Sequence, residues 1–541
     1  MIDLIEIGTS ALKEIYDAAN KILGAESRYA PPVIPADVTH RRGQTLVHQA
    51  TAEEMIEAAR QFAGEKVPHG FRGVDLGGMR QPLECLRLGG YIQGEVGSGK
   101  SSLFDRLRYS IAPLIGSGCG ATRIVDFDDK GALLGKWYTM LPPDVLVQYF
   151  QPLAANSVYW ALYKDFRTAA DALQLATMIV SEGSGGSENA FWYTAARFGL
   201  FAYILTLQRF GGPWGIPELV AGPANQKVFH EILKLLPETR PFAKYFDDNR
   251  EGRSVHSTLQ SCLAKYWVVA ACQARTKERF SVSEFENSEG VLVLGYDPAA
   301  TAAIMGLHQL IVQRLSETAL RRQDTEDRTL FIFDEFRLWN TGTASANSGA
   351  RSPAEALVTT AFRGRSSGSG LFAGSQQVMG VDHVFGRNVS RELLGNLCTK
   401  IFLVTSSIES ARYASETIGG HEVIQSTWGE SWNYSGGNRS YTRSLNRSVV
   451  RRELATVDEV MALPKARWDL DQIVGYGLNP FTPPYRFQTK FRDVALAIRP
   501  PIDFVPNPPR PPKHQRLRPF GLRDAEALKL PPRPALLKLL R

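Results

Sequence analysis

The hydrophobic pattern of the chain changes near Phe71. Before this residue, apolar positions recur at the three- and four-residue spacing of amphipathic helices, so residues 1–70 are predicted to form an N-terminal helical segment. After it, short apolar stretches bounded by glycine or polar residues alternate with helical patterns, which is typical of an α/β fold built on a parallel sheet. The predicted strands are Leu88–Gln93, Arg123–Phe127, Gly290–Leu294, Thr329–Phe333, Leu371–Gly374 and Ile401–Val404.

A long interval separates the second and third predicted strands. It exceeds 150 residues, which is far more than an ordinary crossover connection requires. Residues 188–280 within it have helical periodicity, and we interpret them as an all-α domain inserted into the sheet domain. The aromatic residues of this insert could stack on bases, although core packing is favoured at helical spacing; they are Trp192, Tyr193, Phe198, Tyr203 and Trp267.

Residues 501–541 differ in composition from the rest of the chain. They are rich in proline, and from Arg510 to Arg541 they hold nine Lys/Arg against two Asp/Glu, a surplus equal to the net charge of +7 of the whole chain. We predict a basic, disordered tail with a short helix at Arg523–Leu530. Docking of the tail on DNA, anionic lipid or a membrane partner and simple solvation both remain open.

Two shorter segments have irregular patterns. Thr341–Ser352 is rich in Ser, Gly, Ala and Asn and is predicted to be a surface loop. Ser426–Ser448 combines Trp428, Trp432 and Tyr434 with many small polar residues, which predicts a polar hairpin or a mobile loop.

The overall composition is that of an ordinary globular protein, with 44% hydrophobic and 22% charged residues. Five cysteines without a C-x-x-C pair argue against a disulfide framework or a zinc site. The N-terminus is acidic, and we find no run of about 18 apolar residues, so we expect neither a signal peptide nor a transmembrane helix.

The strongest chemical motif is Gly94–Ser101, which matches the phosphate-loop pattern G-x-x-x-x-G-K-[ST] between a predicted strand and a predicted helix. Glycines let successive backbone N–H groups surround a phosphate chain, Lys100 supplies positive charge to the β- and γ-phosphates, and the Ser101 hydroxyl holds Mg²⁺. A simple glycine turn is the weaker alternative. The predicted nucleotide contacts are Gly94, Gly97, Ser98, Gly99, Lys100, Ser101 and Ser102.

Polar residues follow other predicted strands too. Asp128-Asp129-Lys130 follow the second, Asp334-Glu335 the fourth and Ser375-Gln376 the fifth. Because ligands bind at the carboxyl ends of strands in open α/β sheets, these segments and the phosphate loop predict one crevice. We predict that Asp334 helps to hold Mg²⁺ and that Glu335 polarises the attacking water, so the combination favours hydrolysis of a nucleoside triphosphate, with ATP as the default.

Two more polar residues are candidates for the site. Gln376 is placed to sense the γ-phosphate or to orient water, although a strand-end amide that caps a turn is equally consistent with the pattern. Arg365, close to Arg363, could stabilise transition-state charge on the nucleotide of a neighbouring subunit. From the residues alone, a solvated surface arginine is the favoured interpretation.

Taken in order, these motifs resemble the coupling proteins of bacterial type IV secretion and conjugation, which are hexameric RecA-like motors. The resemblance extends over roughly residues 74–490. Besides the phosphate loop it rests on Val125–Gly131, similar to the family's D-x-K-G strand end, Phe191-Trp192 with Ala196-Arg197, Asp334-Glu335, Gly364-Arg365, Gln376, and Glu453-Leu454 to Leu463-Pro464.

The resemblance implies a RecA-like P-loop NTPase domain at 71–187 and 281–500, with the all-α domain at 188–280 inserted in it. It implies nucleotide contacts by Gly99, Lys100 and Ser101, a sensor role for Gln376 and a trans-acting role for Arg365. It also implies an ATP- and Mg²⁺-dependent DNA translocase that forms a homohexamer and delivers a relaxase–DNA complex or an effector protein to a type IV secretion channel.

The chain departs from the family in lacking predicted N-terminal transmembrane helices and in its basic C-terminal segment. We therefore expect a cytoplasmic protein, held peripherally at the inner membrane through partners. Two alternatives remain: a nucleotide-dependent receptor platform for protein cargo, and a related DNA translocase outside conjugation.

Overall fold

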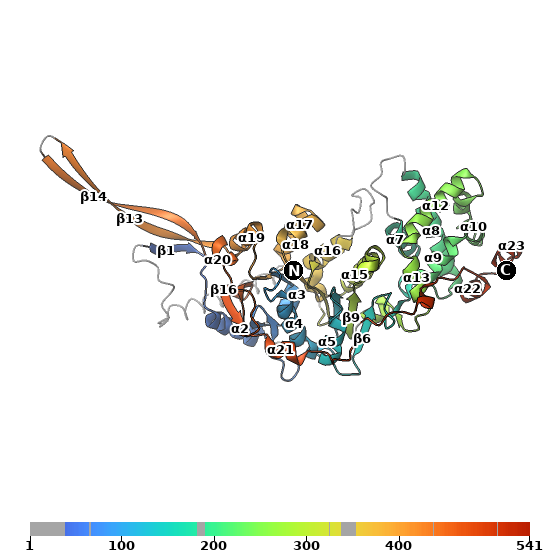
Figure 1. Ribbon diagram of the computed structural model, residues 1–541, viewed down its shortest axis with the longest axis horizontal. Coiled ribbons are helices and arrows are strands. Elements are labelled where there is room, and N and C mark those ends of the chain that lie inside the picture. Colours follow the sequence, from blue (N-terminus) through green and yellow to red (C-terminus); the bar gives the residue numbers. More distant parts are fainter. Residues whose placement is uncertain are drawn as a thin grey trace. The chain divides into compact units, whose positions relative to one another are not determined.

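The computed structural model describes residues 38–63, 66–180, 190–323, 325–336, 353–435, 438–505 and 507–541 (Figure 1). The chain divides into two compact units. The first contains the described residues up to Ile111 and Phe372–Leu496, and the second contains Ala112–Leu371 and Ala497–Arg541. The loop predicted at Thr341–Ser352 lies outside the described residues.

A sheet that contains β4 (Gly90–Gln93) as an interior strand forms the core of the first unit. β4 pairs in parallel with β11 (Ser369–Ser375) on one side and with β12 (Thr399–Phe402) on the other. All four residues of β4 are buried, as expected for a strand covered on both faces. β15 (Ile473–Asn479) and β16 (Thr482–Thr489) continue the sheet from β12 in antiparallel pairing, so this sheet is mixed and not purely parallel as predicted.

Helices of the first unit cover this sheet and connect its strands. Their bounds are α2 (Gln49–Ala63), α3 (Cys85–Leu88), α4 (Lys100–Ile111), α17 (Val378–Phe385), α18 (Arg387–Asn396), α19 (Ile408–Ile418), α20 (Val457–Met461) and α21 (Arg492–Ala497). A short hairpin of β2 (Val74–Leu76) and β3 (Met79–Gln81) precedes α3. Residues 1–37 of the predicted N-terminal helical segment lie outside the described residues. Of the remainder, α2 is a helix as predicted, but β1 (Val38–Gly43) is a strand.

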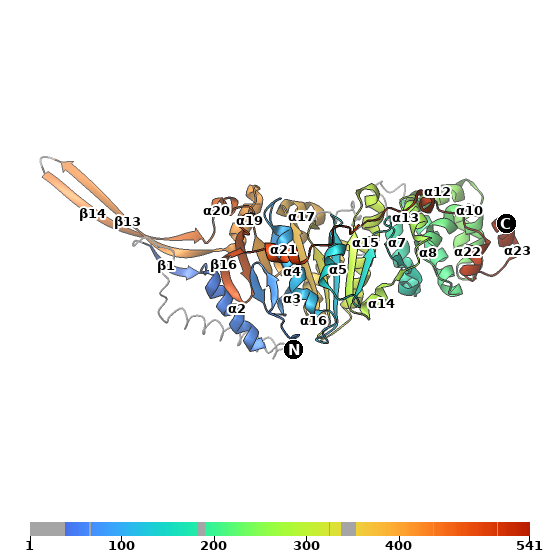
Figure 2. The ribbon, with the colours of Figure 1, turned by 60° about the horizontal axis from the view of Figure 1, so that its bottom comes forward.

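A long β-hairpin projects from the first unit (Figure 1, Figure 2). It consists of β13 (Gly420–Ser435) and β14 (Asn438–Glu453), paired residue by residue from Gly420↔Glu453 to Ser435↔Asn438. β1 pairs with the base of β13 only, up to Gln425. Of the two structures predicted for Ser426–Ser448, the hairpin is the one observed.

The second unit is built on four parallel strands in the order β10-β5-β9-β6. Its strands are β5 (Thr122–Asp128), β6 (Leu146–Phe150), β9 (Gly290–Gly295) and β10 (Arg328–Phe333). Every residue of β5, β9 and β10 is buried, which explains why they appear in the sequence as short, nearly continuous apolar stretches. The helices beside this sheet are α5 (Leu133–Met140), α6 (Leu162–Asp165), α14 (Val282–Glu286), α15 (Thr301–Ala319) and α16 (Pro353–Ser367).

A block of helices lies between β6 and β9 in the sequence. It contains α7 (Ala169–Ile179), α8 (Ala190–Phe210), α9 (Ile216–Ala221), α10 (Gln226–Leu233), α11 (Arg240–Ala243), α12 (Arg250–Ala264) and α13 (Trp267–Gln273). The short strands β7 (Tyr159–Trp160) and β8 (Arg279–Phe280) pair in parallel at the two ends of this block. The helices thus begin before the predicted boundary at residue 188.

α8 is the central helix of the block. It is the one helix of the described chain that is long and apolar enough to span a membrane, and 56% of its apolar window is buried inside the protein. Tyr203 of α8 is fully buried and packs on Phe229 with ring centroids 5.4 Å apart. We therefore interpret α8 as a core helix. The predicted core role of the aromatic residues does not extend to Trp267, which is 41% exposed.

The C-terminal segment is ordered, contrary to the prediction of a disordered tail. Arg510 is 6% exposed, and its guanidinium donates hydrogen bonds to the Pro152 carbonyl (3.1 Å) and the Thr276 hydroxyl (2.8 Å). Two short helices follow, α22 (Leu522–Ala527) and α23 (Pro534–Leu540). Composition suggested disorder because the segment lacks long elements of its own, but its apolar side chains, such as Leu536, are buried in the second unit.

Candidate functional site

The phosphate loop has a backbone shape that depends on glycine. Gly97 and Gly99 have φ angles of +81° and +96°, a region that residues with a Cβ rarely adopt. The Ser98 N–H donates to the Glu95 carbonyl (3.1 Å) to close the turn, and the Leu103 N–H donates to the Gly99 carbonyl (3.0 Å) as α4 begins. The loop therefore leads directly into the N-terminus of α4, where N–H groups and the helix dipole favour an anion.

Neighbouring strands of the first unit hold the loop from both sides. The Gly94 N–H donates to the Ser375 carbonyl at the end of β11, and the Glu95 N–H donates to the Val404 carbonyl beyond β12, both at 3.1 Å. A Cβ on Gly94 would lie 2.4 Å from the Ser98 Oγ, so this position has no room for a larger residue. The loop is thus fixed before any ligand binds.

A third clamp comes from the segment before β15, which the sequence analysis missed. The Lys465 Nζ lies 2.9 Å from the Glu95 carboxylate, and the Ala466 N–H donates to the Gly97 carbonyl (2.9 Å). Burial raises the pKa of Glu95, but hydrogen bonds from Lys465 and from the Ser406 backbone outweigh it, so the pKa lies below its ordinary value. Lys465 directly follows the Leu463-Pro464 pair singled out in the sequence, which is the signal that could have led to it.

The predicted phosphate ligands lie in the loop and in the first turn of α4. Ser98 is 1% exposed and Lys100 is 8% exposed, while Ser101 and Ser102 are half-buried in the first turn of α4. Backbone N–H groups, a lysine and a helix N-terminus surround one short loop. These residues fit the phosphate chain of a nucleotide.

Gln376 also belongs to the first unit and lies next to the loop. It follows Ser375, the residue whose carbonyl accepts the Gly94 N–H, and it is half-buried. The structure therefore brings Gln376 and the start of the phosphate loop together, as a γ-phosphate sensor would require.

The predicted acidic pair lies in the second unit, directly after β10. Asp334 and Glu335 are both 6% exposed. The register of β10 and β5 sets Phe333 opposite Phe127, so the acidic pair follows one strand and Asp128 ends the other. The Lys130 Nζ lies 3.9 Å from the Asp334 carboxylate. The D-x-K-G segment and the acidic strand end are thus neighbours.

The other carboxylates at the end of β5 have structural roles. Asp128 accepts hydrogen bonds from the backbone N–H groups of Ala132 (3.0 Å) and Leu133 (2.8 Å) and so fixes the start of α5. Asp126 accepts from the Trp137 indole (2.8 Å). Asp128 and Asp126 thus help to fix the local structure at this strand end.

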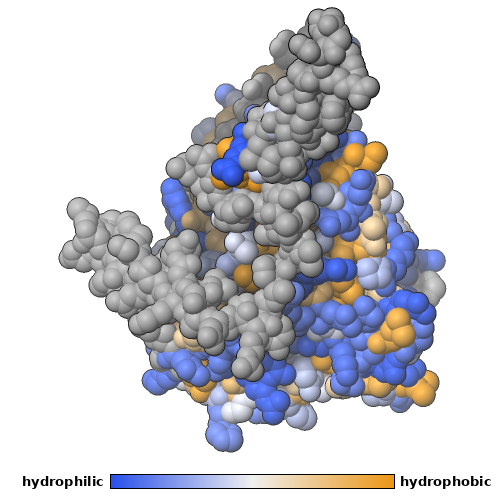
Figure 3. All heavy atoms as spheres, turned by 90° about the vertical axis from the view of Figure 1, so that its left-hand side faces the viewer, coloured by the Kyte–Doolittle hydropathy of each residue, from blue (hydrophilic) through white to orange (hydrophobic). Residues whose placement is uncertain are grey.

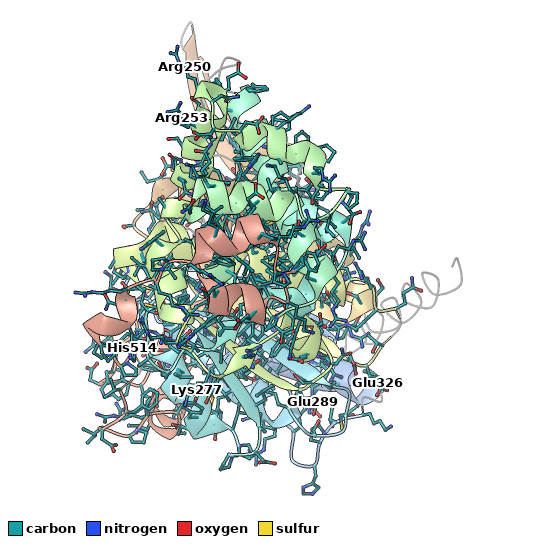
Figure 4. The ribbon with its side chains drawn as sticks, turned by 90° about the vertical axis from the view of Figure 1, so that its right-hand side faces the viewer. Arg250, Arg253, Lys277, Glu289, Glu326 and His514 are labelled. Atoms are coloured by element: carbon teal, nitrogen blue, oxygen red, sulfur yellow. The ribbon has the colours of Figure 1, made fainter. Side chains whose placement is uncertain are left out.

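Carboxylates also lie at the amino ends of the same strands, where they serve a different purpose. Glu289 accepts from the Thr122 N–H (3.1 Å) and thereby fixes the start of β5. Glu326, two residues before β10, is exposed at that edge; Figure 4 shows Glu289 and Glu326 at one edge of the second unit, with Arg250 and Arg253 at the opposite edge. Glu326 and Glu335 thus flank the two ends of one strand.

Arg365 lies near the end of α16 in the second unit and is exposed, as is Arg363. An exposed position leaves the guanidinium accessible to another molecule.

In the described part of the chain, no group of three or more His, Cys, Asp or Glu could hold a metal ion. Magnesium in nucleotide-binding proteins is commonly held by oxygens of the nucleotide together with only one or two protein ligands.

Comparison with known proteins agrees with this geometry. Residues 75–470 match the family model described as "Type IV secretion-system coupling protein DNA-binding domain". Comparison with curated proteins gives no significant match.

Among solved structures, the unbound monoclinic form of the bacterial conjugative coupling protein TrwBdeltaN70 has a TM-score of 0.61 at 18% identity, covering 86% of this chain and 97% of that chain. The plasmid coupling protein TrwB in complex with ADP and Mg²⁺ has a TM-score of 0.60 at 18% identity, covering 86% and 96%. Its complex with the non-hydrolysable ATP analogue ADPNP has a TM-score of 0.60 at 18% identity, covering 89% and 98%.

These structures confirm the predicted fold class, and the family match extends over most of the chain and confirms the predicted resemblance. The chain belongs to the type IV secretion-system coupling protein family, through its DNA-binding domain.

Proposed function

We propose that this protein is an ATP-hydrolysing motor of the conjugative coupling type that binds and moves DNA. The observation that carries the proposal is the phosphate loop, clamped by Ser375, Val404 and Ala466 and leading into α4, in a chain that also buries an acidic pair after β10. The solved relatives of this fold include complexes with ADP and Mg²⁺ and with an ATP analogue, which supports the same ligand here.

Each predicted site residue has a role in this proposal. Backbone N–H groups of the loop and the Lys100 ammonium hold the β- and γ-phosphates, and Ser101 and Asp334 hold Mg²⁺, which neutralises phosphate charge when bound. Glu335 accepts a proton from the attacking water, and Gln376 orients that water or senses the γ-phosphate.

Arg365 acts on the nucleotide of a neighbouring subunit, in a homohexameric ring. Its exposed position on α16 is compatible with such a role, because a trans-acting arginine must lie at the surface to reach another chain. Activity per subunit should then depend on assembly.

The cargo is DNA, carried with a relaxase, or an effector protein, and the destination is a type IV secretion channel. The family description, which names a DNA-binding domain, supports DNA as a partner. We place the protein in the cytoplasm, held peripherally at the inner membrane by components of the secretion system.

The first experiment compares Glu335→Gln with Glu326→Gln, because the two glutamates flank opposite ends of β10. ATPase rates are measured over a range of protein concentrations, with and without single- and double-stranded DNA. Glu335→Gln should bind ATP and lose turnover by about 100-fold or more, while Glu326→Gln keeps the wild-type rate. Equal rates for Glu335→Gln and wild type would refute the assignment, and an ATPase that DNA leaves unchanged would favour a receptor platform for protein cargo.

A mixing experiment tests the trans-acting arginine. Lys100→Ala and Arg365→Ala are each expected to be inactive, but a mixed ring contains some interfaces with an intact loop on one side and an intact arginine on the other. Mixing the two inactive variants should restore measurable ATPase activity. Without restoration, in rings shown by light scattering to be mixed, Arg365 does not act in trans.

A further inference from the structure

The β13–β14 hairpin has no role in the proposed ATPase. Beyond Gln425, where the pairing with β1 ends, the described strand pairing of β13 is with β14 alone. Each of its strands has 16 residues, so the hairpin is about 50 Å long at roughly 3.3 Å per residue.

Strand register assigns the residues of the hairpin to two faces. In an antiparallel pair, residues directly opposite each other share a face, and successive residues alternate between faces. From Gln425 to Ser448, one face holds only uncharged small or polar residues; this neutral face consists of Gln425, Thr427, Gly429, Ser431, Asn433, Ser435, Asn438, Ser440, Thr442, Ser444, Asn446 and Ser448. All charged residues of this stretch are therefore on the other face.

The second face combines arginines with aromatic and aliphatic residues, and we call it the aromatic–arginine face. Its arginines recur at every fourth residue of β14, about 13 Å apart, at Arg439, Arg443, Arg447 and Arg451. Apolar pairs occupy the rows between them: Trp432↔Tyr441, Trp428↔Leu445 and Ile424↔Val449.

The charge on this face is only partly balanced. Arg443 lies opposite Glu430 and Arg451 opposite Glu422, whereas Arg447 lies opposite Ser426 and Arg439 opposite Tyr434. The face thus carries net positive charge in rows that alternate with apolar rows.

Such a face needs a partner. A two-stranded ribbon is at best marginally stable by itself in water, and Val449 in one of the apolar rows is 49% exposed. Exposed apolar residues such as Met379 and Ile408 also occur on other elements of the first unit, and Figure 3 shows apolar patches among hydrophilic surface. Segregation of neutral polar residues to one face and of arginines with aromatic residues to the other is typical of a binding surface.

We propose that the aromatic–arginine face of the β13–β14 hairpin binds single-stranded DNA. Single-strand binding sites combine positive charge that follows the backbone with aromatic residues on which bases stack, and this face alternates the two. The inference rests on the proposed function in taking DNA as the cargo, and it adds a DNA site separate from the phosphate loop.

The alternatives account for fewer of these observations. A duplex offers mainly phosphates to such a ribbon and leaves the aromatic rows without stacking partners. A lipid surface would have to accept Glu430 and the free backbone edges of a two-stranded ribbon, which is costly in hydrocarbon. A second copy of the chain would not require the net positive charge.

The test uses the full-length protein without nucleotide and a fluorescent oligothymidylate, with binding measured by anisotropy over a range of salt concentrations. The double variant Arg443→Ser/Arg447→Ser should bind at least about tenfold more weakly, and its slope of log affinity against log salt should fall by about 1.4, since two phosphate contacts are lost. Trp432→Ala should also weaken binding about tenfold, through lost stacking.

The matched control changes the neutral face. Thr442→Ala/Asn446→Ala should keep single-strand affinity within about twofold, because each of these residues directly precedes one of the substituted arginines but lies on the other face. The DNA-free ATPase rate should be unchanged in all variants, which also shows that they fold.

Three results would overturn the proposal. The first is an Arg443→Ser/Arg447→Ser variant with the wild-type affinity for oligothymidylate and the wild-type salt slope. The second is a Thr442→Ala/Asn446→Ala control that loses as much affinity as the arginine variant. It would also fail if the variants bind oligothymidylate normally but lose binding to another partner. That partner would be a lipid surface if flotation with phosphatidylglycerol vesicles is lost, a second copy of the chain if oligomerisation in light scattering is lost, or duplex DNA if binding to a duplex of the same length is lost. Because binding is measured without nucleotide, failure here leaves the Glu335→Gln experiment as a separate test of the ATPase.

Discussion

The phosphate loop and the β13–β14 hairpin are both rich in small residues, but they are held in opposite ways. Three of the eight residues of the loop, Gly94, Glu95 and Gly97, bond through their backbone to Ser375, Val404 and Ala466, each several hundred positions away in the sequence. The hairpin is held by its own ladder and, at its base, by β1. Long-range bonds fix a geometry that must not move during chemistry, whereas a self-contained ladder leaves a surface free to meet a partner.

The largest effect should come from removing the charge at the end of the loop. Lys100→Ala should lower the ATPase turnover by about 100- to 1,000-fold, because the β- and γ-phosphates lose their positive partner. Steady-state ATPase rates measure this, with the exposed Lys277 changed to alanine as the control. A Lys100→Ala protein with more than a tenth of wild-type turnover would contradict the role of the loop.

Distortion of the clamped backbone should have the next largest effect. Gly99→Ala forces a Cβ onto a residue with φ +96° and sets it 2.8 Å from the Ile473 side chain. We expect a loss of about 1–3 kcal/mol in free energy of unfolding and at least tenfold weaker nucleotide binding, measured by denaturant titration and by fluorescent-nucleotide binding.

Gly116→Ala is the control for that experiment. Gly116 also has a positive φ (+73°), but nothing lies within 4 Å of its Cβ position. It should show only the backbone strain of about 1 kcal/mol and normal nucleotide binding. If Gly99→Ala and Gly116→Ala have the same stability and the same nucleotide affinity, the close packing around the phosphate loop does not contribute to nucleotide binding.

Weakening one clamp should have a smaller effect. The Lys465 side chain is 61% exposed, so its pair with Glu95 contributes at most about 1 kcal/mol. Lys465→Ala should reduce nucleotide affinity by less than about fivefold, measured by titration, while Arg467→Ala, which removes a pair with Asp469, should change nothing. A loss as large as that of Lys100→Ala would mean that Lys465 contacts the nucleotide directly.

Shortening the hairpin should have the smallest effect on the rest of the protein. Residues 427–446 can be replaced by an Asn-Gly turn, because Ser426 and Arg447 are direct partners in the ladder. The free energy of unfolding should change by less than about 0.5 kcal/mol, and the DNA-free ATPase rate should be unchanged. A larger drop in the free energy of unfolding, or a lower ATPase rate, would show that the hairpin stabilises the rest of the protein and is not a self-contained ladder.

Much of the fold was predictable from the sequence because it depends on local patterns. All six predicted strands form, since each is a short apolar stretch bounded by turn residues and buried in a sheet. The phosphate loop is recognisable because its glycines are required by local backbone angles. The acidic pair is recognisable because it directly follows an apolar strand.

Tertiary structure decided what depends on residues that are distant in the chain. β15 and β16 join the sheet as antiparallel strands through pairing with β12, which local periodicity does not specify. Lys465 reaches Glu95, and Arg510 reaches Pro152, only after the chain has folded. The two faces of the hairpin likewise depend on the register that pairs Ser426 with Arg447, because a shift by one residue would mix arginines and neutral residues on each face.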